Sequence, residues 1–202
     1  MAVTWKQVLA RIGPRPHIEA AGAFALAYND LEFSLYSLMG LLLQEDDDLV
    51  PFLFAELNNS QKVDFIRRLC ARQHSKAVYD SLDHALRCFS ICAENRNLIM
   101  HASPAPPGTP VRDALHVVKG VKGRPDDMNE YTLSLTDLRN AAKSAHALSQ
   151  HVYELVGAIA DLSVGVEPDT WPQTPPTPRK LSLSLRPEVL SDARSQPPPS
   201  EA

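Results

Sequence analysis

Arg96 and His101 are the residues of this chain whose types and spacing best suit chemistry. They stand in the stretch Glu94-Asn95-Arg96-Asn97-Leu98-Ile99-Met100-His101, which ends a long apolar-periodic segment. A permanently charged guanidinium beside an apolar seam needs an anionic partner, because burying an unpaired charge is unfavourable. An imidazole in the last turn of a helix lies where the helix dipole favours its charged form. The pair therefore predicts a site that binds an anion and moves protons.

The same two residues also have a purely structural interpretation. Pro104 follows closely, and the residue before a proline is pushed out of the α region, so the helix is expected to end between 101 and 103. In this interpretation Arg96 is a buried ion-pair partner and His101 a C-terminal cap. Short motifs match by chance often enough that both interpretations stay open at this point.

Composition limits the class of protein. With 202 residues, 44% of them hydrophobic, the chain can bury one sizeable core and carry additional tails. A net charge of −4 argues against a general polyanion binder, so contact with nucleic acid would need a local basic patch. Three cysteines are too few for a disulfide framework and suit a reducing cytoplasm. No stretch has the length and apolarity of a membrane span, so we expect a soluble, cytoplasmic protein with no membrane partner.

Apolar residues recur at helical spacing in four segments, which predict helices over 17–44, 61–74, 75–101 and 137–162. The first helix has the most continuous seam and more apolar surface than a solvent-exposed helix needs, which favours a central helix or a subunit interface. Its seam consists of Phe24, Tyr28, Leu31, Leu35, Leu38 and Leu42, widened by Phe33, Tyr36 and Met39. Ser60 and Thr136 are expected to cap the second and fourth helices.

Two groups of polar residues admit a functional interpretation beside a bland one. Asn29 and Glu32 interrupt the seam of the first helix; they are either solvated or point inward toward the arginine of the motif. Arg68, Arg72 and Lys76 recur every fourth residue and would form a basic ridge if the second helix reached Lys76. Such a ridge is usually a solvated face, but it also suits a ribose-phosphate backbone.

His84, Cys88 and Cys92 lie at successive four-residue spacings, which would bring them to one face of a helix. Zinc prefers four nitrogen or sulfur ligands, and the sequence offers no evident fourth. Both cysteines also fit the apolar period of the third helix, so we interpret them as small core residues. The sequence predicts neither a metal site nor a cofactor.

After the third helix the period changes. Segments 111–118 and 130–135 predict two strands of a β-hairpin that carries Lys119, Lys122 and Arg124. The predicted organisation is an N-terminal arm over 1–16, a helical domain over 17–165 and a proline-rich tail over 166–202 that is disordered, with 180–185 as its one contact patch. The predicted fold class is all-α: an up-and-down four-helix bundle with the hairpin inserted between the third and fourth helices.

A helical bundle whose third long helix ends in Arg-x4-His resembles the HEPN domain (higher eukaryotes and prokaryotes nucleotide-binding). The family motif is Arg-x(4–6)-His, often with a polar residue after the arginine; here Arg96, Asn97 and His101 match it. The phrase Tyr28-Asn29-Asp30-Leu31-Glu32 is similar to that of bacterial members. The resemblance covers about residues 17–165, and its motif is short.

The resemblance implies a metal-independent endoribonuclease that dimerises and cuts RNA through the ribose 2′-hydroxyl. His101 would act as general base or acid, Arg96 would bind the scissile phosphate, and Asn97 would orient His101 or bind phosphate. Glu94 would support this group. Five helical residues separate two positions by about 140° around the axis, so one copy's pair is expected to converge poorly in a straight helix. A composite site built by two copies, or a distorted last turn, would bring the pair together.

Two further classes of function stay open. Many members of the family are not nucleases, so the domain is alternatively a catalytically inactive nucleotide-binding or protein-interaction module. In that case Arg96 would hold a homodimer together and His101 would cap the helix. A third possibility is a toxin-like nuclease silenced by an antitoxin protein.

Overall fold

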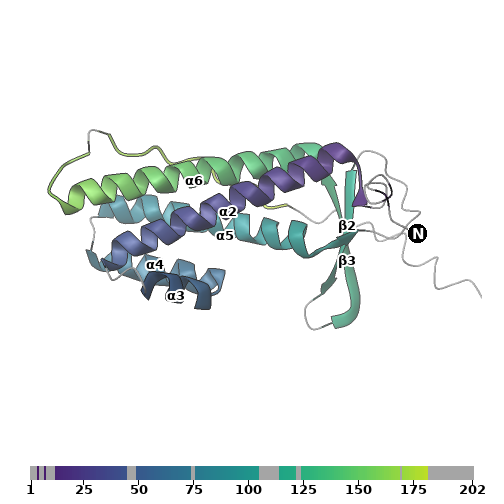
Figure 1. Ribbon diagram of the computed structural model, residues 1–202, viewed down its shortest axis with the longest axis horizontal. Helices are drawn as coiled ribbons and strands as arrows, with labels where there is room; N and C mark the ends of the chain where they lie inside the picture. Colours follow the sequence, from purple (N-terminus) through teal and green to yellow (C-terminus); the bar gives the residue numbers. More distant parts are fainter. Residues whose placement is uncertain are drawn as a thin grey trace, which may run out of the picture.

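The computed structural model describes residues 4, 7, 12–44, 49–73, 76–104, 114–121, 124–168 and 170–181. These residues are mostly helical with a small antiparallel sheet, so the prediction of a mainly helical chain is confirmed. The elements in chain order are α2 (Arg15–Leu43), α3 (Leu49–Glu56), α4 (Asn59–Gln73), α5 (Lys76–His101), β1 (Ser103–Pro104), β2 (Ala114–Val121), β3 (Arg124–Ser134) and α6 (Leu135–Ser163), as Figure 1 shows. Within the described part of the chain, no helix is both long and apolar enough to cross a membrane.

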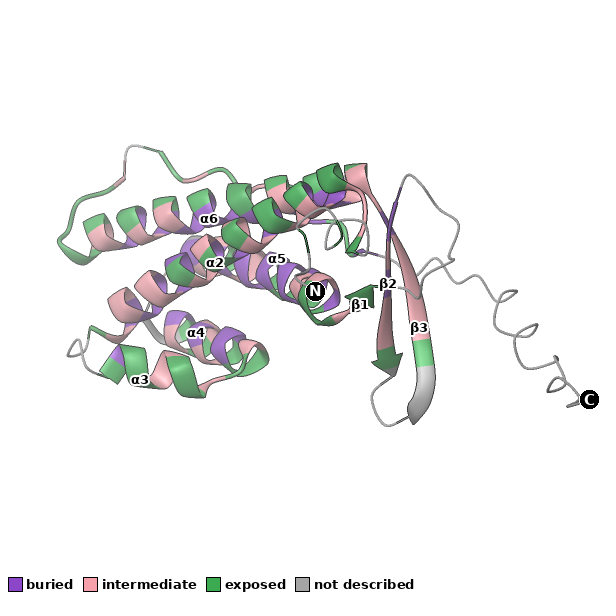
Figure 2. Ribbon diagram, turned by 45° about the vertical axis from the view of Figure 1, so that its right-hand side comes forward, coloured by how far each residue is buried: buried purple, intermediate pink, exposed green. Residues whose placement is uncertain are grey.

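Helices α2, α5 and α6 lie side by side along the molecule, and α4 packs on α5 and α2 (Figure 1). The predicted seam of α2 forms the centre of this packing, because all six of its residues are at most 1% exposed. It meets Phe89 of α5 and Val152 of α6 in one apolar cluster. The buried faces of the long helices point toward one another in Figure 2. Phe33, one of the residues predicted to widen the apolar face, is 59% exposed.

Helix α3 reverses the chain between α2 and α4, which therefore run in the same direction. Asn59 Nδ2 donates to the hydroxyl of Tyr28 at 2.9 Å, and Lys62 Nζ lies 3.6 Å from Glu32 Oε1, so the contacts advance together along both helices. Helix α3 is not predicted from the sequence, because its eight residues are too few to show a helical period. Pro51 is compatible with this helix since it stands in the first turn, where its missing N–H breaks no helical bond.

Two helix caps lie earlier than the sequence predicted. Asn58, not Ser60, is hydrogen-bonded across the start of α4. Ser134, not Thr136, caps α6: its Oγ accepts from the backbone N–H of Asp137 at 3.1 Å. Asparagine, serine and threonine all favour the N-cap position, so residue type alone does not decide between the two candidates at each helix.

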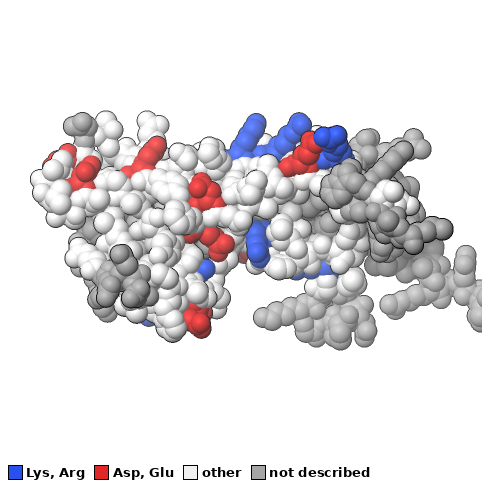
Figure 3. Space-filling model, in the orientation of Figure 1, with Lys and Arg blue, Asp and Glu red and all other residues white. Residues whose placement is uncertain are grey.

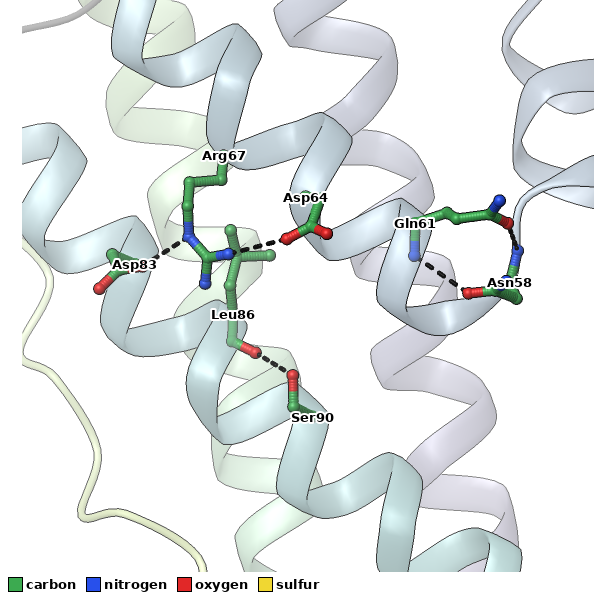
Figure 4. A network of polar contacts seen from close by, with 7 residues as sticks. All are labelled: Asn58, Gln61, Asp64, Arg67, Asp83, Leu86 and Ser90. Carbon is green, nitrogen blue, oxygen red and sulfur yellow. Dashed lines mark hydrogen bonds and ion pairs between the residues drawn. The ribbon is translucent and has the colours of Figure 1, made fainter.

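Helix α4 is attached to α5 by polar contacts on its outer side (Figure 4). Asn58 Oδ1 accepts from the N–H of Gln61 at 3.1 Å while Gln61 Oε1 accepts from the N–H of Asn58 at 2.9 Å, a reciprocal capping box. Arg67 Nε then donates to Asp83 Oδ1 of α5 at 2.8 Å, and its Nη1 reaches Asp64 at 3.1 Å. Of these contacts, the Arg67–Asp83 pair joins α4 to α5, whereas the others stabilise α4 itself.

The sheet has the order β1-β2-β3, with both pairs antiparallel. Val117 is the partner of both Pro104 and Tyr131, so the short β1 continues the chain of α5 directly onto the edge of β2. A second apolar cluster attaches the sheet to the helices; it contains Ala20, Leu98, Leu115, Val117, Leu133, Leu138 and Leu181. The sheet therefore covers the end of α5 that carries the Arg-x4-His motif.

Gly13 fixes how the chain enters α2. Its φ is +146°, a backbone conformation that residues with a side chain rarely adopt. A Cβ there would lie 2.8 Å from Leu115 Cδ1. Helix α2 begins at Arg15, two residues inside the predicted arm over 1–16. The arm otherwise lies mostly outside the described residues.

Residues 170–181 form a strap along α5, which corrects the prediction that everything after 165 is disordered. Asn95, only 2% exposed, donates from Nδ2 to the carbonyl of Arg179 at 3.0 Å and accepts at Oδ1 from the N–H of Leu181 at 2.9 Å. Leu181 joins the apolar cluster under the sheet, and Pro178 is buried. Prolines exclude helix but not an extended strap whose few hydrogen bonds are made by side chains of another element. Residues 182–202 lie outside the described part of the chain.

Asn95→Ala should release this strap, because it removes the donor to Arg179 and the acceptor for Leu181. Unsatisfied groups of this kind cost on the order of 1–3 kcal/mol. We expect faster hydrogen exchange at the Leu181 amide and a lower free energy of unfolding in urea. Asn140→Ala, at an exposed position of α6, is the matched control and should change neither. Unchanged exchange at Leu181 in Asn95→Ala would show that the clamp does not hold the strap.

Candidate functional site

The last two turns of α5 bring Arg96 and His101 into direct contact. Arg96 Nη1 lies 2.8 Å from His101 Nε2. A guanidinium nitrogen only donates, so Nε2 is the acceptor here and a neutral ring carries its proton on Nδ1. His101 is exposed and Arg96 half-buried, so the pair lies at the surface with its polar atoms facing outward.

The expectation that one copy's pair converges poorly is therefore wrong for these two side chains. The estimate of about 140° describes the directions in which the residues leave the helix axis. It ignores the length of the arginine side chain, which carries its polar end well away from its own position on the helix. One helix can thus juxtapose a phosphate-binding fork and a proton-transfer group without a partner subunit.

Asn97 joins this pair to the sheet. Its Oδ1 accepts from Arg96 Nη1 at 3.5 Å, and its main-chain carbonyl accepts from Lys119 Nζ at 3.1 Å. Lys119 belongs to β2 and is 22 residues away in sequence. The sequence predicts that Lys119 lies on the hairpin but indicates no role for it. Lys119 reaches the end of α5 because β1, which follows α5, pairs with β2.

Glu94 and Asn95, the two residues before Arg96, serve the strap. Glu94 forms an ion pair with Lys180, and Asn95 holds the strap backbone. Asn95 is the residue that the sequence reading of this stretch missed. The sequence contains part of the evidence for this role, since an amide side chain that becomes buried on a helix needs hydrogen-bond partners. The sequence does not show that these partners come from more than eighty residues further along the chain.

Among the described residues, Arg96 forms no hydrogen bond or ion pair with Asn29 or Glu32 of α2. Asn29 is exposed, and Glu32 is paired with Lys62 at 3.6 Å. Arg96 nevertheless lies near this region, since its charge acts on the buried Tyr28. Burial, followed by the charge of Glu32, raises the pKa of Tyr28, while the hydrogen bond from Asn59 and the charge of Arg96 oppose the shift. Glu32 thus contributes to the electrostatics around the motif without touching it.

The predicted basic ridge does not assemble beside Arg96. Helix α4 ends at Gln73, and Lys76 opens α5 instead of continuing α4. Lys76 and Arg96 are twenty residues apart on α5, about 30 Å at 1.5 Å per residue. Arg68 is exposed near the same end as Lys76, and the side chain of Arg72 lies outside the described residues. Lys76 is therefore too far away to contact a phosphate held by Arg96.

Basic side chains gather elsewhere on the face that Figure 3 shows. They lie over the half of α6 nearer the sheet, whereas acidic side chains predominate toward the other end. Arg139 and Lys143 are exposed residues of this half of α6. On this face, positive charge therefore gathers toward the end of the molecule where the sheet lies.

The cysteines and His84 support the packing of α5. Cys70, Cys88 and Cys92 are buried thiols, and burial raises the pKa of Cys70 to about 11 and that of Cys92 to about 12. His84 Nε2 lies 2.8 Å from the carbonyl of Pro175 in the strap and 3.4 Å from Cys88 Sγ. Among the described residues, no group of three or more histidine, cysteine or acidic side chains is arranged to hold a metal.

Comparison with protein-family models, with curated proteins and with solved structures finds no match. Membership of the HEPN family is therefore a proposal, and it depends on the residues and helices of this chain.

The buried thiols should make the protein less stable at alkaline pH. The unfolded thiol loses its proton near pH 9, whereas folded Cys92 keeps it to about pH 12, so stability present below pH 9 is lost as the pH rises toward 12. Each thiol contributes at most about 1.4 kcal/mol per pH unit. Urea unfolding at pH 8 and pH 10 should show a smaller decline for Cys92→Ala than for the unchanged protein. Comparing the decline within each protein removes the packing cost of the substitution, and equal declines would contradict the prediction.

Proposed function

We propose that this protein is a metal-independent endoribonuclease of the HEPN type. One observation carries the proposal: Arg96 Nη1 and His101 Nε2 lie 2.8 Å apart at the exposed end of α5. A guanidinium binds phosphate in a bidentate manner, and an imidazole transfers protons near neutral pH. The arrangement of helices α2, α4, α5 and α6, with the hairpin between α5 and α6, is consistent with the bundle that the family resemblance implies.

Binding of an RNA phosphate would change the hydrogen bonding between Arg96 and His101. A phosphodiester competes for the fork of Arg96, because a charged acceptor is stronger than a neutral imidazole. Binding would thus free Nε2 of His101 to accept the proton of the ribose 2′-hydroxyl. The 2′-oxygen then attacks phosphorus, the bond to the 5′-oxygen breaks, and that oxygen takes up a proton. The products are a 2′,3′-cyclic phosphate and a 5′-hydroxyl.

Two neighbours would assist the step. Arg96 stabilises the additional negative charge on the phosphoryl oxygens in the transition state. Asn97 keeps contact with Arg96 and orients it or binds phosphate, and Lys119 adds positive charge from the sheet side. A single His101 cannot be base and acid in the same step, so the proton for the 5′-oxygen would come from water or from a second copy of the chain.

The proposal includes a homodimer. Leu26 and Phe33 are 73% and 59% exposed, and they stand seven residues apart on one face of α2. Exposed apolar side chains of this size on one helix face are typical of an interface. Two copies related by a two-fold axis would bring two motifs into one assembly.

The alternative is a catalytically inactive nucleotide-binding or protein-interaction module of the same family. It is favoured by the fact that Nε2 of His101 already has a partner in Arg96. The pair is therefore satisfied without substrate and can serve as a purely structural contact. In this case His101→Ala leaves ligand binding unchanged, while Arg96→Ala weakens it.

Cleavage of RNA by the purified protein should persist in excess EDTA, because the 2′-hydroxyl supplies the nucleophile and no metal-bound water is required. Products should end in 2′,3′-cyclic phosphate, and RNA with 2′-O-methyl groups should resist. His101→Ala should lower the rate by roughly a hundredfold or more, the scale of a general acid or base. Arg96→Lys should also be poor, since an ammonium does not reproduce the bidentate fork. The measurement is product analysis on a panel of single-stranded RNAs.

His146→Ala is the matched control, because His146 is exposed on α6. It should cleave at the unchanged rate. Loss of cleavage in EDTA, or equal cleavage of DNA, would rule out this mechanism. Cleavage that survives in His101→Ala would remove His101 from it.

Sedimentation equilibrium at micromolar concentration should show a dimer, and Phe33→Glu should shift it to monomer, because a buried unpaired carboxylate opposes association. Val164→Glu places the same charge on a residue that is 75% exposed beyond the end of α6, and it should remain dimeric. A monomeric unchanged protein would refute the homodimer.

A further inference from the structure

A cavity of about 700 Å³ opens between α5, the sheet and the strap, and its lining includes Asn97, which contacts Arg96. Each element contributes two of the residues that matter for binding: Asn97 and Leu98 from α5, Lys119 and Tyr131 from the sheet, and Lys180 and Leu181 from the strap. The volume is that of a site for a small molecule or one unit of a polymer. The strap is thus a wall of the cavity and not an appendage.

The lining combines positive charge with flat and apolar surface. Among the described residues of the lining, Lys119 and Lys180 bring two ammonium groups and Glu94, which is paired with Lys180, brings one carboxylate, so one net positive charge remains. Tyr131 offers an aromatic ring, with Leu98 beside it. Lysines bind phosphate oxygens, and aromatic rings stack on bases. The chemistry of the lining therefore matches a nucleotide.

The cavity adjoins the reactive pair through Asn97. This residue lines the cavity and also contacts Arg96 Nη1 at 3.5 Å, while its carbonyl accepts from Lys119. A phosphate held by Arg96 would therefore lie within one nucleotide of the cavity. Such a nucleotide must be unstacked to enter, which favours single-stranded over duplex RNA.

We propose that this cavity binds the nucleotide next to the scissile phosphate of single-stranded RNA, with its base against Tyr131 and its outer phosphate on Lys119 and Lys180. This deepens the proposed ribonuclease function and rests on it for the identity of the polymer. The cavity then positions the nucleotide that flanks the cut, because the base is held while the phosphate is attacked.

The strap makes this subsite conditional on the fold of the C-terminal segment. Lys180 and Leu181 stand in the lining only while Asn95 holds Arg179 and Leu181 by their main chain. Asn95 is a positioning residue: it stands in the lining of the cavity, but both groups of its side-chain amide are engaged by the strap backbone. Releasing the strap removes one cation and one apolar wall from the cavity without altering the Arg96–His101 pair.

The test is fluorescence polarisation with a labelled single-stranded octanucleotide of RNA carrying 2′-O-methyl groups, which binds without being cut. Lys119→Ala and Lys180→Ala should each weaken binding and make the slope of log affinity against log salt less steep by about 0.7, the value per phosphate contact for single strands. Tyr131→Leu keeps an apolar side chain under the sheet and should weaken binding at least about fivefold, the low end for base stacking. Asn95→Ala should resemble Lys180→Ala in affinity.

Lys143→Ala is the matched control, because it removes the same charge from an exposed position of α6 outside the cavity lining. It reports the general electrostatic effect and should leave the salt slope unchanged. Thermal unfolding of each variant separates loss of binding from loss of fold.

The outcomes distinguish this inference from the nuclease itself. Lysine and tyrosine variants that bind like Lys143→Ala overturn the subsite, even if the unchanged protein cleaves RNA in EDTA. Weakened binding in a protein that never cleaves supports the subsite and refutes the nuclease. Failure of the unchanged protein to bind the octanucleotide at micromolar concentration overturns the subsite, while the cleavage assay separately decides the nuclease.

Discussion

The burial of the α5 seam against α2 and α6 is the constraint on which the rest of this structure depends. Leu82, Phe89 and Cys92 are each at most 1% exposed, and they fix the rotation of the helix about its axis. Each following residue is turned by about 100°, so four consecutive residues face four different surroundings. Glu94 meets the strap side chain, Asn95 the strap backbone, Arg96 the histidine of the motif, and Asn97 the sheet. One helical turn thereby joins the core, the sheet, the strap and the candidate reactive pair.

The strap shows how a proline-rich segment becomes ordered without secondary structure. Proline lowers the entropy of the unfolded chain and lacks an N–H that would need a partner, so an extended path loses little on folding. The remaining main-chain groups still need hydrogen bonds, and α5 supplies them through Asn95 and His84. Burial of Leu181 under the sheet then adds apolar contact at the end of the path.

The contact between Arg96 and His101 is the point at which a structural and a catalytic interpretation meet. The guanidinium of Arg96 uses Nε2 of His101 as a hydrogen-bond acceptor, which is the role that a general base requires of this nitrogen. The same contact also satisfies both groups when no ligand is bound. The surroundings favour ligand binding, because Lys119 and the cavity adjoin Asn97 next to the pair, and no carboxylate of the described residues pairs with the half-buried Arg96.

The sequence by itself determined the elements whose signal is local. A period of three and four residues predicted the long helices, and the six seam residues of α2 are all buried, because the period is a direct consequence of helical geometry. It also singled out Arg96 and His101 from their spacing. Tertiary structure alone decided that the side chain of Phe33 stays exposed and that Glu32 pairs with Lys62. It also decided that Lys76 belongs to α5, at the opposite end of that helix from the motif. It also decided that residues 170–181 pack as a strap on Asn95, a contact across more than eighty residues of chain. Such contacts depend on which elements become neighbours after folding, and neither composition nor periodicity encodes that choice.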